Sequence, residues 1–249
     1  MRMHDLGPDR PRAALFIHPM LSSGEALSST LRGRLPEDVR ILAPDLAAHG
    51  DAAACSFRSA QAEAAEIHAY LVDHGIAELS LAFGASVGGV VLLELLRFDE
   101  PRFGRLVFEG TSLFERAPLL EALAGGVLAP IRRLASGFPE FVAAGLARMY
   151  RPAFGASTAA ALASIDEESF RGIVRDCANV RLPSLPEEVQ RRCLFCYGSK
   201  EFNRRRARKV LPRKYPLAAI RLWDGTDHCE YMAKNPGAYG QMLRGFLEE

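Results

Sequence analysis

The chain has 249 residues, of which 49% are apolar, and its formal net charge is +1. This length and composition suit one sizeable domain, and no second full domain is required. The near-zero net charge gives no electrostatic reason to expect binding to nucleic acid or to an anionic membrane surface. The N-terminal segment does not read as a signal peptide, and no apolar run is long and uncharged enough to span a bilayer. We therefore expect no membrane association.

Five cysteines are scattered along the chain. An odd, scattered set fits a reducing compartment better than a disulfide framework, so we expect a cytoplasmic protein. Cys193 and Cys196 have C-x-x-C spacing, but they lie in an apolar run of strand length with no second ligand pair nearby. We interpret them as packing residues rather than as a zinc or redox site.

Apolar runs of strand length alternate with helical patterns over the first 110 residues. The apolar runs cover residues 13–18, 39–46, 78–84 and 104–110, and the helical patterns cover residues 59–73 and 86–98. Strands that are apolar throughout and separated by helices indicate a parallel sheet covered on both faces. The sequence therefore predicts a doubly wound α/β fold with a mostly parallel sheet.

The alternation of strand and helix patterns stops between residues 111 and 188, where no apolar run of strand length appears and short helical patterns are separated by Gly and Pro. This stretch is too long for a loop and predicts an inserted helical subdomain. Beyond it, strands are expected at 192–198 and 218–225, a basic helix near 203–210 and a last helix at 236–249. We thus expect residues 1–110 and 189–249 to form the α/β core, and residues 111–188 to form the insertion.

The segment GASVG, residues 84–88, places Ser86 between a predicted strand and a predicted helix. The carboxyl edge of an open α/β sheet is where ligands bind. Glycines at 84 and 88 let the backbone turn sharply beside its neighbours, and the helix N-terminus offers unpaired N–H groups to a developing negative charge. The pattern is common by chance, so its position between strand and helix is what makes it informative.

With GASVG in this position, the chain resembles the α/β-hydrolase family, and further segments match in the family's order. GASVG is similar to the family's nucleophile elbow, which implies that Ser86 is the nucleophile. The segment FIHPMLSSG is similar to the family's His-Gly turn, with Pro19 in place of the glycine. The resemblance implies an oxyanion hole made by the backbone N–H groups of Met20 and Val87.

The segment APDLAAHGDA, residues 43–52, resembles the family's Asp-Leu-Pro-Gly-His-Gly loop. The likeness covers nearly the whole chain except the helical insertion. In the family, that position holds a cap that shapes the pocket. Here the cap would contribute apolar side chains, among them Leu113, Phe114, Phe138, Phe141 and Met149.

A serine hydroxyl needs a base to take its proton, and that base needs an orienting carboxylate. His228 follows the last predicted strand, where the family carries its catalytic histidine. Glu201 follows the strand at 192–198, where the family usually carries an aspartate. Glu109, at the end of the strand at 104–110, is an alternative acid. The resemblance implies a triad of Ser86, His228 and one of these two glutamates.

Residues 200–214 hold eight basic residues against one acidic residue. One interpretation is a solvated helix face with basic residues near its C-terminal end. The other is that Arg204, Arg205 and Arg206 contact an anionic part of the substrate. His18 is interpreted as a structural loop residue, with a pocket contact as the alternative.

These features predict a serine hydrolase that cleaves a carboxylic ester, thioester or lactone through an acyl-enzyme. The expected partner is a small molecule with an acyl group, no cofactor or metal is implied, and a monomer and a homodimer both remain open. Acyl transfer, C–C bond hydrolysis and cofactor-free peroxidation are alternatives, because a fold does not determine one reaction. A ligand-binding protein with little turnover is a further alternative.

Overall fold

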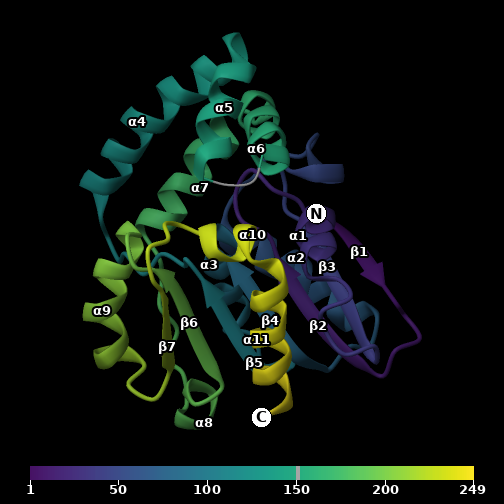
Figure 1. The fold of residues 1–249 in the computed structure, drawn as a ribbon. Coiled ribbons are helices and arrows are strands. Elements are labelled where there is room, and N and C mark those ends of the chain that lie inside the picture. Colours follow the sequence, from purple (N-terminus) through teal and green to yellow (C-terminus); the bar gives the residue numbers. More distant parts are fainter. Residues whose placement is uncertain (150–151) are drawn as a thin grey trace.

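The computed structural model describes residues 1–149 and 152–249, without the side chains at 120, 123–125, 127–129, 131–132, 146–149 and 152–157. Within these residues one seven-stranded sheet has the order β1-β3-β2-β4-β5-β6-β7 (Figure 1). Its strands are β1 (Arg2–Leu6), β2 (Arg12–Ile17), β3 (Val39–Asp45), β4 (Glu78–Ala85), β5 (Arg102–Glu109), β6 (Cys193–Gly198) and β7 (Ala219–Trp223). The predicted doubly wound, mostly parallel fold is therefore confirmed.

Strand β1 is the one antiparallel member of the sheet and was not predicted. It pairs with β3 in the register Arg2 with Asp45 through Leu6 with Ile41, whereas the other strand pairs are parallel. Its five residues, RMHDL, include three charged or titratable side chains, and it lies half-exposed at the sheet edge. An edge strand with one exposed side does not need the apolar run that marks a buried parallel strand.

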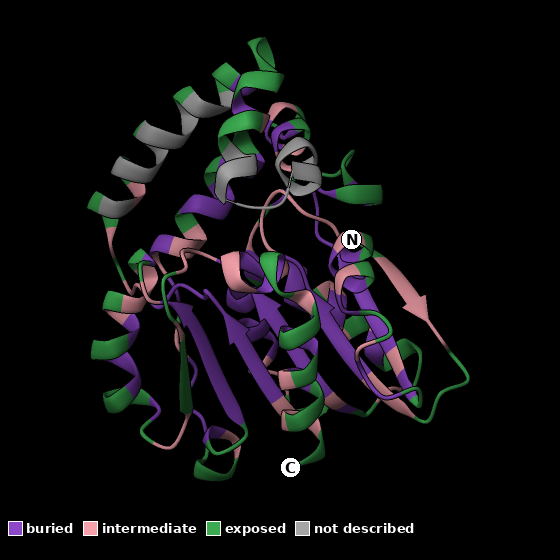
Figure 2. Cartoon of the chain, in the orientation of Figure 1, coloured by how far each residue is buried: buried purple, intermediate pink, exposed green. Residues whose placement is uncertain are grey.

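Helices cover both faces of the sheet, and the strands β2 to β6 are largely buried, whereas β7 at the edge is mostly exposed (Figure 2). One face carries α1 (Gly24–Leu31) and α11 (Pro236–Glu248), and the other carries α2 (Ala60–Asp73), α3 (Val87–Leu95) and α9 (Phe202–Lys214). On the first face Leu27 and Tyr239 pack with Phe16 and Phe83. Helix α1 was not predicted. Its eight residues are too few to show a helical period clearly.

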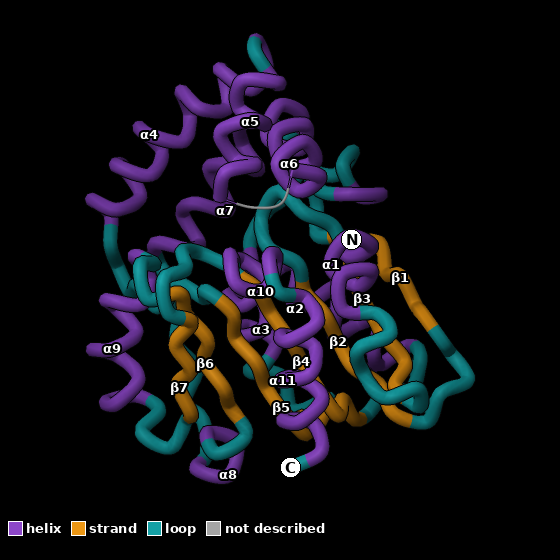
Figure 3. Tube along the Cα trace, viewed as in Figure 1, coloured by secondary structure: helices purple, strands orange, loops and turns teal. Residues whose placement is uncertain are grey.

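Four helices stand above the sheet in Figures 1 and 3: α4 (Pro118–Gly137), α5 (Pro139–Met149), α6 (Pro152–Ser164) and α7 (Glu167–Ala178). Several short helices were expected here, but α4 runs for 20 residues and continues through Pro130. A proline inside a helix removes one hydrogen bond without always ending the helix. Two short helices, α8 (Glu187–Gln190) and α10 (Glu230–Lys234), and the 3-10 turn η1 (Gly50–Ala52) complete the described elements. None of the described helices is long and apolar enough to cross a membrane.

Candidate active site

Ser86 occupies a strained turn between β4 and α3. Its backbone has φ 53° and ψ −117°, a conformation that residues other than glycine rarely adopt. The Ser86 N–H donates to the Glu109 carbonyl oxygen at 2.8 Å, which ties the turn to the end of β5. A Cβ atom at Gly88 would collide with the carbonyl oxygen of Ile17 in β2. The small residue at 88 thus lets α3 start directly against the sheet.

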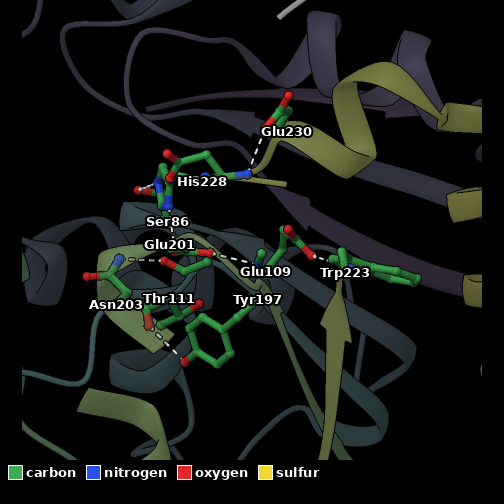
Figure 4. A network of polar contacts seen from close by, with 12 residues as sticks. Ser86, Glu109, Thr111, Tyr197, Glu201, Asn203, Trp223, His228 and Glu230 are labelled. Atoms are coloured by element: carbon green, nitrogen blue, oxygen red, sulfur yellow. Dashed lines mark hydrogen bonds and ion pairs between the residues drawn. The ribbon is translucent and has the colours of Figure 1, made fainter. Parts of the chain in front are cut away.

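The His228 side chain lies between a hydroxyl and a carboxylate (Figure 4). Its Nε2 atom is 3.0 Å from Ser86 Oγ, and its Nδ1 atom is 2.7 Å from Glu201 Oε1. When the neutral imidazole carries its proton on Nδ1, it donates to Glu201, and Nε2 is left to accept the Ser86 hydroxyl proton. The three residues come from the ends of β4, β6 and β7, which are far apart in the chain but meet at one edge of the sheet.

Packing and hydrogen bonds hold the Glu201–His228 pair in place. Glu201 is buried at the start of α9, and its Oε2 atom accepts the Gly198 N–H at 3.1 Å. Gly110, at φ 59°, packs so closely that an added Cβ would lie 2.8 Å from His228 Nδ1 and 3.1 Å from Glu201 Oε1. The Asn203 side chain in turn donates to the Gly110 carbonyl oxygen at 2.9 Å. The end of β5 therefore supports the imidazole from behind.

The pKa of His228 is raised well above the ordinary value of 6.5. Burial by itself lowers the pKa, but contacts with Cys229 and with Glu201 raise it by more. Since burial also raises the pKa of the Cys229 thiol, that thiol is neutral near pH 7. The Glu201 carboxylate is then the charge that retains the proton on the imidazole.

Glu109 is a second buried carboxyl group behind this pair. Its Oε2 atom accepts hydrogen bonds from the Tyr239 hydroxyl at 2.7 Å and from Trp223 Nε1 at 3.4 Å, and its Oε1 atom is buried without a partner among the described residues. Burial, opposed by the Tyr239 hydrogen bond and reinforced by the charge of Glu201, raises the pKa of Glu109 to about 8. Of the two candidate acids, Glu201 is the one within hydrogen-bond distance of His228 Nδ1.

Glu109→Gln is expected to flatten the pH dependence of stability. The carboxyl group titrates near 4.5 when unfolded and near 8 when folded, so between these values the folded protein holds a proton that the unfolded chain has released. The free energy of unfolding then decreases as pH rises, by up to ~1.4 kcal/mol per pH unit in the middle of that window. Urea unfolding at pH 5, 6, 7 and 8 measures this slope.

The matched control is Glu187→Gln, at an exposed glutamate of α8. It should leave the slope of the wild type unchanged. An equal slope in the Glu109→Gln variant and the wild type would show that Glu109 is already ionised in the folded protein below pH 8.

The two residues expected to supply an oxyanion hole come from the start of α3 and from the loop after β2. Val87 is the first residue of α3, and the first N–H groups of a helix have no partner within it. Met20 lies in the loop that follows β2, and this loop turns sharply at Leu21, where φ is 63°. Met20, Ser86 and His228 all line one cavity.

This cavity has a volume of about 380 Å³. Its lining includes residues 19–23 and Ala26, Leu27 and Thr30 of α1. Cys229, Met232 and Ala233 around α10, Gly50, and Thr158 and Ala161 of α6 complete it. Such a size is at the lower end of the range for small-molecule sites. The contribution of α1 was missed, and the only sequence signal for it is its place directly after the Met20 loop.

The apolar residues expected to line the pocket do not do so where the structure describes them. Leu113 is buried in the core, and Phe114 stacks on Phe202 at 5.4 Å between ring centroids. Phe138 and Phe141 are 65% and 71% exposed, away from the cavity. The side chain of Met149 lies outside the described residues.

The arginines of α9 are not among the described residues that line the cavity. Arg206 donates to the Leu113 carbonyl oxygen at 3.2 Å and lies 3.8 Å from Glu115. Arg205 is exposed, and Arg204 is half-buried. These contacts do not favour the hypothesis that the basic segment meets the substrate, because α9 packs against the chain between β5 and α4 instead.

His18 is also absent from the cavity wall. It is fully buried at the end of β2, accepts the Leu46 N–H at Nε2 (3.0 Å), and donates from Nδ1 to the Pro19 carbonyl oxygen (2.7 Å). Burial, with a smaller effect from His49, lowers the pKa of His18 to about 3. A neutral imidazole that joins two loops fits the structural interpretation.

The chain belongs to the α/β hydrolase family: the model of that family matches residues 14–239. Its fold is similar to that of a thermophilic esterase from Thermogutta terrifontis, with a TM-score of 0.76, 17% identity, and coverage of 99% of this chain and 92% of that one. A bromoperoxidase from Bacillus anthracis has a TM-score of 0.70 at 16% identity, with coverage of 99% and 95%. An N-acyl homoserine lactone degrading enzyme has a TM-score of 0.70 at 19% identity, with coverage of 98% and 96%. A search of curated proteins finds no match.

Proposed function

We propose that this hydrolase is a serine esterase that cleaves ester-like bonds through an acyl-enzyme. The observation that carries the proposal is the His228 imidazole, which lies 3.0 Å from Ser86 Oγ and 2.7 Å from Glu201 Oε1 beside an apolar cavity. A hydroxyl, an imidazole and a carboxylate in this order form the arrangement that activates a serine nucleophile. The esterases among proteins of similar fold agree with this chemistry.

In the proposed reaction, neutral His228 takes the Ser86 proton while Oγ attacks the ester carbonyl carbon. The carbonyl oxygen becomes an oxyanion that accepts hydrogen bonds from the Met20 and Val87 N–H groups. His228 then gives its proton to the departing alkoxide, and an alcohol leaves. A water molecule repeats the sequence on the acyl-enzyme and releases the acid. Each oxyanion donor would contribute about 3 kcal/mol to stabilising the transition state.

We propose that residues 111–188 act as a cap over this site. Helix α6 supports the assignment, because its residues Thr158 and Ala161 line the cavity together with residues of α1. The substrate would be a small molecule with an acyl group. The five cysteines form no disulfide, which agrees with a reducing compartment such as the cytoplasm.

The proposal is tested by rapid mixing with p-nitrophenyl butyrate. We expect a burst of p-nitrophenol close to one equivalent of enzyme when deacylation is the slower step, and mass spectrometry of the quenched protein should find the acyl group on Ser86. Hydrolysis with the acyl group on another residue would contradict the proposed nucleophile. A folded protein that neither cleaves esters nor becomes acylated would instead favour a ligand-binding role.

The acid limb of the pH profile should reflect His228. Its imidazole must be neutral to accept the Ser86 proton, and its pKa is raised above 6.5. We therefore expect kcat/KM to increase with pH through an apparent pKa above 6.5, because the free enzyme's essential base controls this limb. Initial rates between pH 5 and 9 with a neutral ester measure it. A profile that is flat from pH 5 to 9 would exclude His228 as the base.

A further inference from the structure

Apart from His228, the lining of the cavity beside Ser86 is uncharged. Among the described residues that form it there is no Asp, Glu, Lys or Arg, and His228 is its one titratable ring. The hydroxyl of Thr30 is already used, since it donates to the Ala26 carbonyl oxygen at 2.9 Å. The Ser23 hydroxyl likewise accepts the Ala26 N–H at 3.1 Å as the cap of α1. A charged group carried on the chain of the substrate, away from His228, would therefore lose its hydration in this cavity without meeting an opposite charge, which is unfavourable.

One wall of the cavity is a stripe on α1. Ala26 and Thr30 are four residues apart, so they lie one above the other on the same face of the helix. Both are half-buried, whereas Ser29 on the same helix is exposed. Ala26 has the smallest side chain that a chiral residue can offer, so the space in front of it is open to a ligand.

This wall is held firmly by Asp45 at the end of β3. The Gly24 N–H at the start of α1 donates to Asp45 Oδ1 at 2.6 Å. The Asp51 N–H donates to Asp45 Oδ2 at 2.7 Å, and His4 Nε2 lies 2.8 Å from the same oxygen. Asp45 thus joins α1 to the turn that contains Gly50, and both of these segments line the cavity. A wall fixed to the core in this way can select ligands by size.

We propose that this cavity binds an uncharged apolar chain of the substrate and that Ala26 on α1 determines the length of chain accepted. The inference rests on the proposed function for the reacting groups and names the substrate class: neutral esters with an aliphatic or aryl chain, in preference to esters whose chain ends in a charge. Length selection then belongs to the α/β core, since among the described residues α6 contributes Thr158 and Ala161 to the lining and the exposed Phe138 and Phe141 contribute nothing.

The test compares two ester series, because the chain could belong to the acyl or to the alcohol part. One series is p-nitrophenyl acetate, butyrate, hexanoate and octanoate, and the other is methyl, butyl, hexyl and octyl acetate. A p-nitrophenyl monoester of octanedioic acid supplies the octanoyl chain with a terminal carboxylate. For the wild type we expect kcat/KM at least tenfold higher for the neutral octanoate than for the octanedioate monoester.

In each series we compare kcat/KM for the ester with the eight-carbon chain with kcat/KM for the ester with the shortest chain. Ala26→Leu should lower this ratio at least tenfold in the series whose chain enters the cavity. Thr30→Leu, on the same stripe, should act in the same direction and serves if Ala26→Leu does not fold. Ser29→Leu on the exposed face is the matched control and should keep the wild-type ratio. The proposal is overturned if kcat/KM for the octanedioate monoester equals that for the octanoate ester. It is also overturned if Ala26→Leu lowers kcat/KM equally for long and short esters.

A binding measurement separates this inference from the proposed reaction. Calorimetric titration of the Ser86→Ala variant with 1-octanol and with the ammonium ion of 8-amino-1-octanol requires no turnover, and this cation cannot use the oxyanion hole as a carboxylate could. We expect the alcohol to bind at least tenfold more tightly than the ion, and Ala26→Leu to weaken its binding in the same background. Equal or tighter binding of the ion would refute the uncharged cavity even if ester hydrolysis is confirmed. Preferential binding of the alcohol would support it even if no ester is cleaved.

Discussion

Ser86→Ala is expected to reduce kcat for ester hydrolysis by at least about 10⁴-fold, because removal of a serine nucleophile abolishes the covalent route. The same change should eliminate labelling by a fluorophosphonate probe, which requires an activated hydroxyl. The backbone at residue 86 has φ 53°, and alanine carries the same conformational cost there as serine. The variant should therefore fold like the wild type, which circular dichroism and a thermal melt can verify.

A serine elsewhere on the cavity wall provides the control. Ser22 lines the same cavity, whereas the hydroxyl 3.0 Å from His228 Nε2 is that of Ser86, so Ser22→Ala should retain labelling. Labelling that persists in Ser86→Ala and disappears in Ser22→Ala would assign the nucleophile to the other serine. Retention of labelling in both variants would show that the probe reacts outside this site.

Glu201→Gln is expected to lower kcat by about 10³-fold or more, the order of effect seen when the carboxylate that orients a catalytic histidine is made neutral. Glutamine has nearly the same shape as glutamate but removes the negative charge 2.7 Å from His228 Nδ1. The charge that raises the pKa of His228 is thereby lost. The acid limb of the pH profile should then shift to lower pH together with the decrease in kcat.

Glu109→Gln is the matched comparison, since it is the same substitution at the other buried glutamate of this region. Its carboxyl accepts from Tyr239 and Trp223, and its pKa of about 8 leaves it mostly neutral at pH 7. We expect kcat at pH 7 to decrease less than tenfold. If Glu109→Gln produced the larger loss, Glu109 would be the orienting acid and Glu201 a supporting residue.

The sequence could predict the parallel strands because burial on both faces of a sheet demands unbroken apolar runs. The runs at 78–84 and 104–110 correspond to β4 and β5 within two residues at either end. The turn at Ser86 could also be predicted, because Gly84 and Gly88 stand on either side of it in the sequence, although the group that a larger residue at 88 would meet is the Ile17 carbonyl oxygen of β2. Edge strand β1 and the eight-residue helix α1 were not predicted, because neither has a long apolar pattern.

The sequence by itself determined the alternation of the parallel strands with helices other than α1, the turn that carries Ser86, and the candidate partners His228, Glu201 and Glu109. Only the tertiary structure brings Glu201 within hydrogen-bond distance of His228 Nδ1, while Tyr239, 130 residues away in the chain, donates to Glu109. It also decided the cavity wall, which α1 forms with residues of α6 and α10. The physical reason is that apolar periodicity reports local conformation and burial. Which side chains converge depends instead on how elements distant in the chain pack across one edge of the sheet.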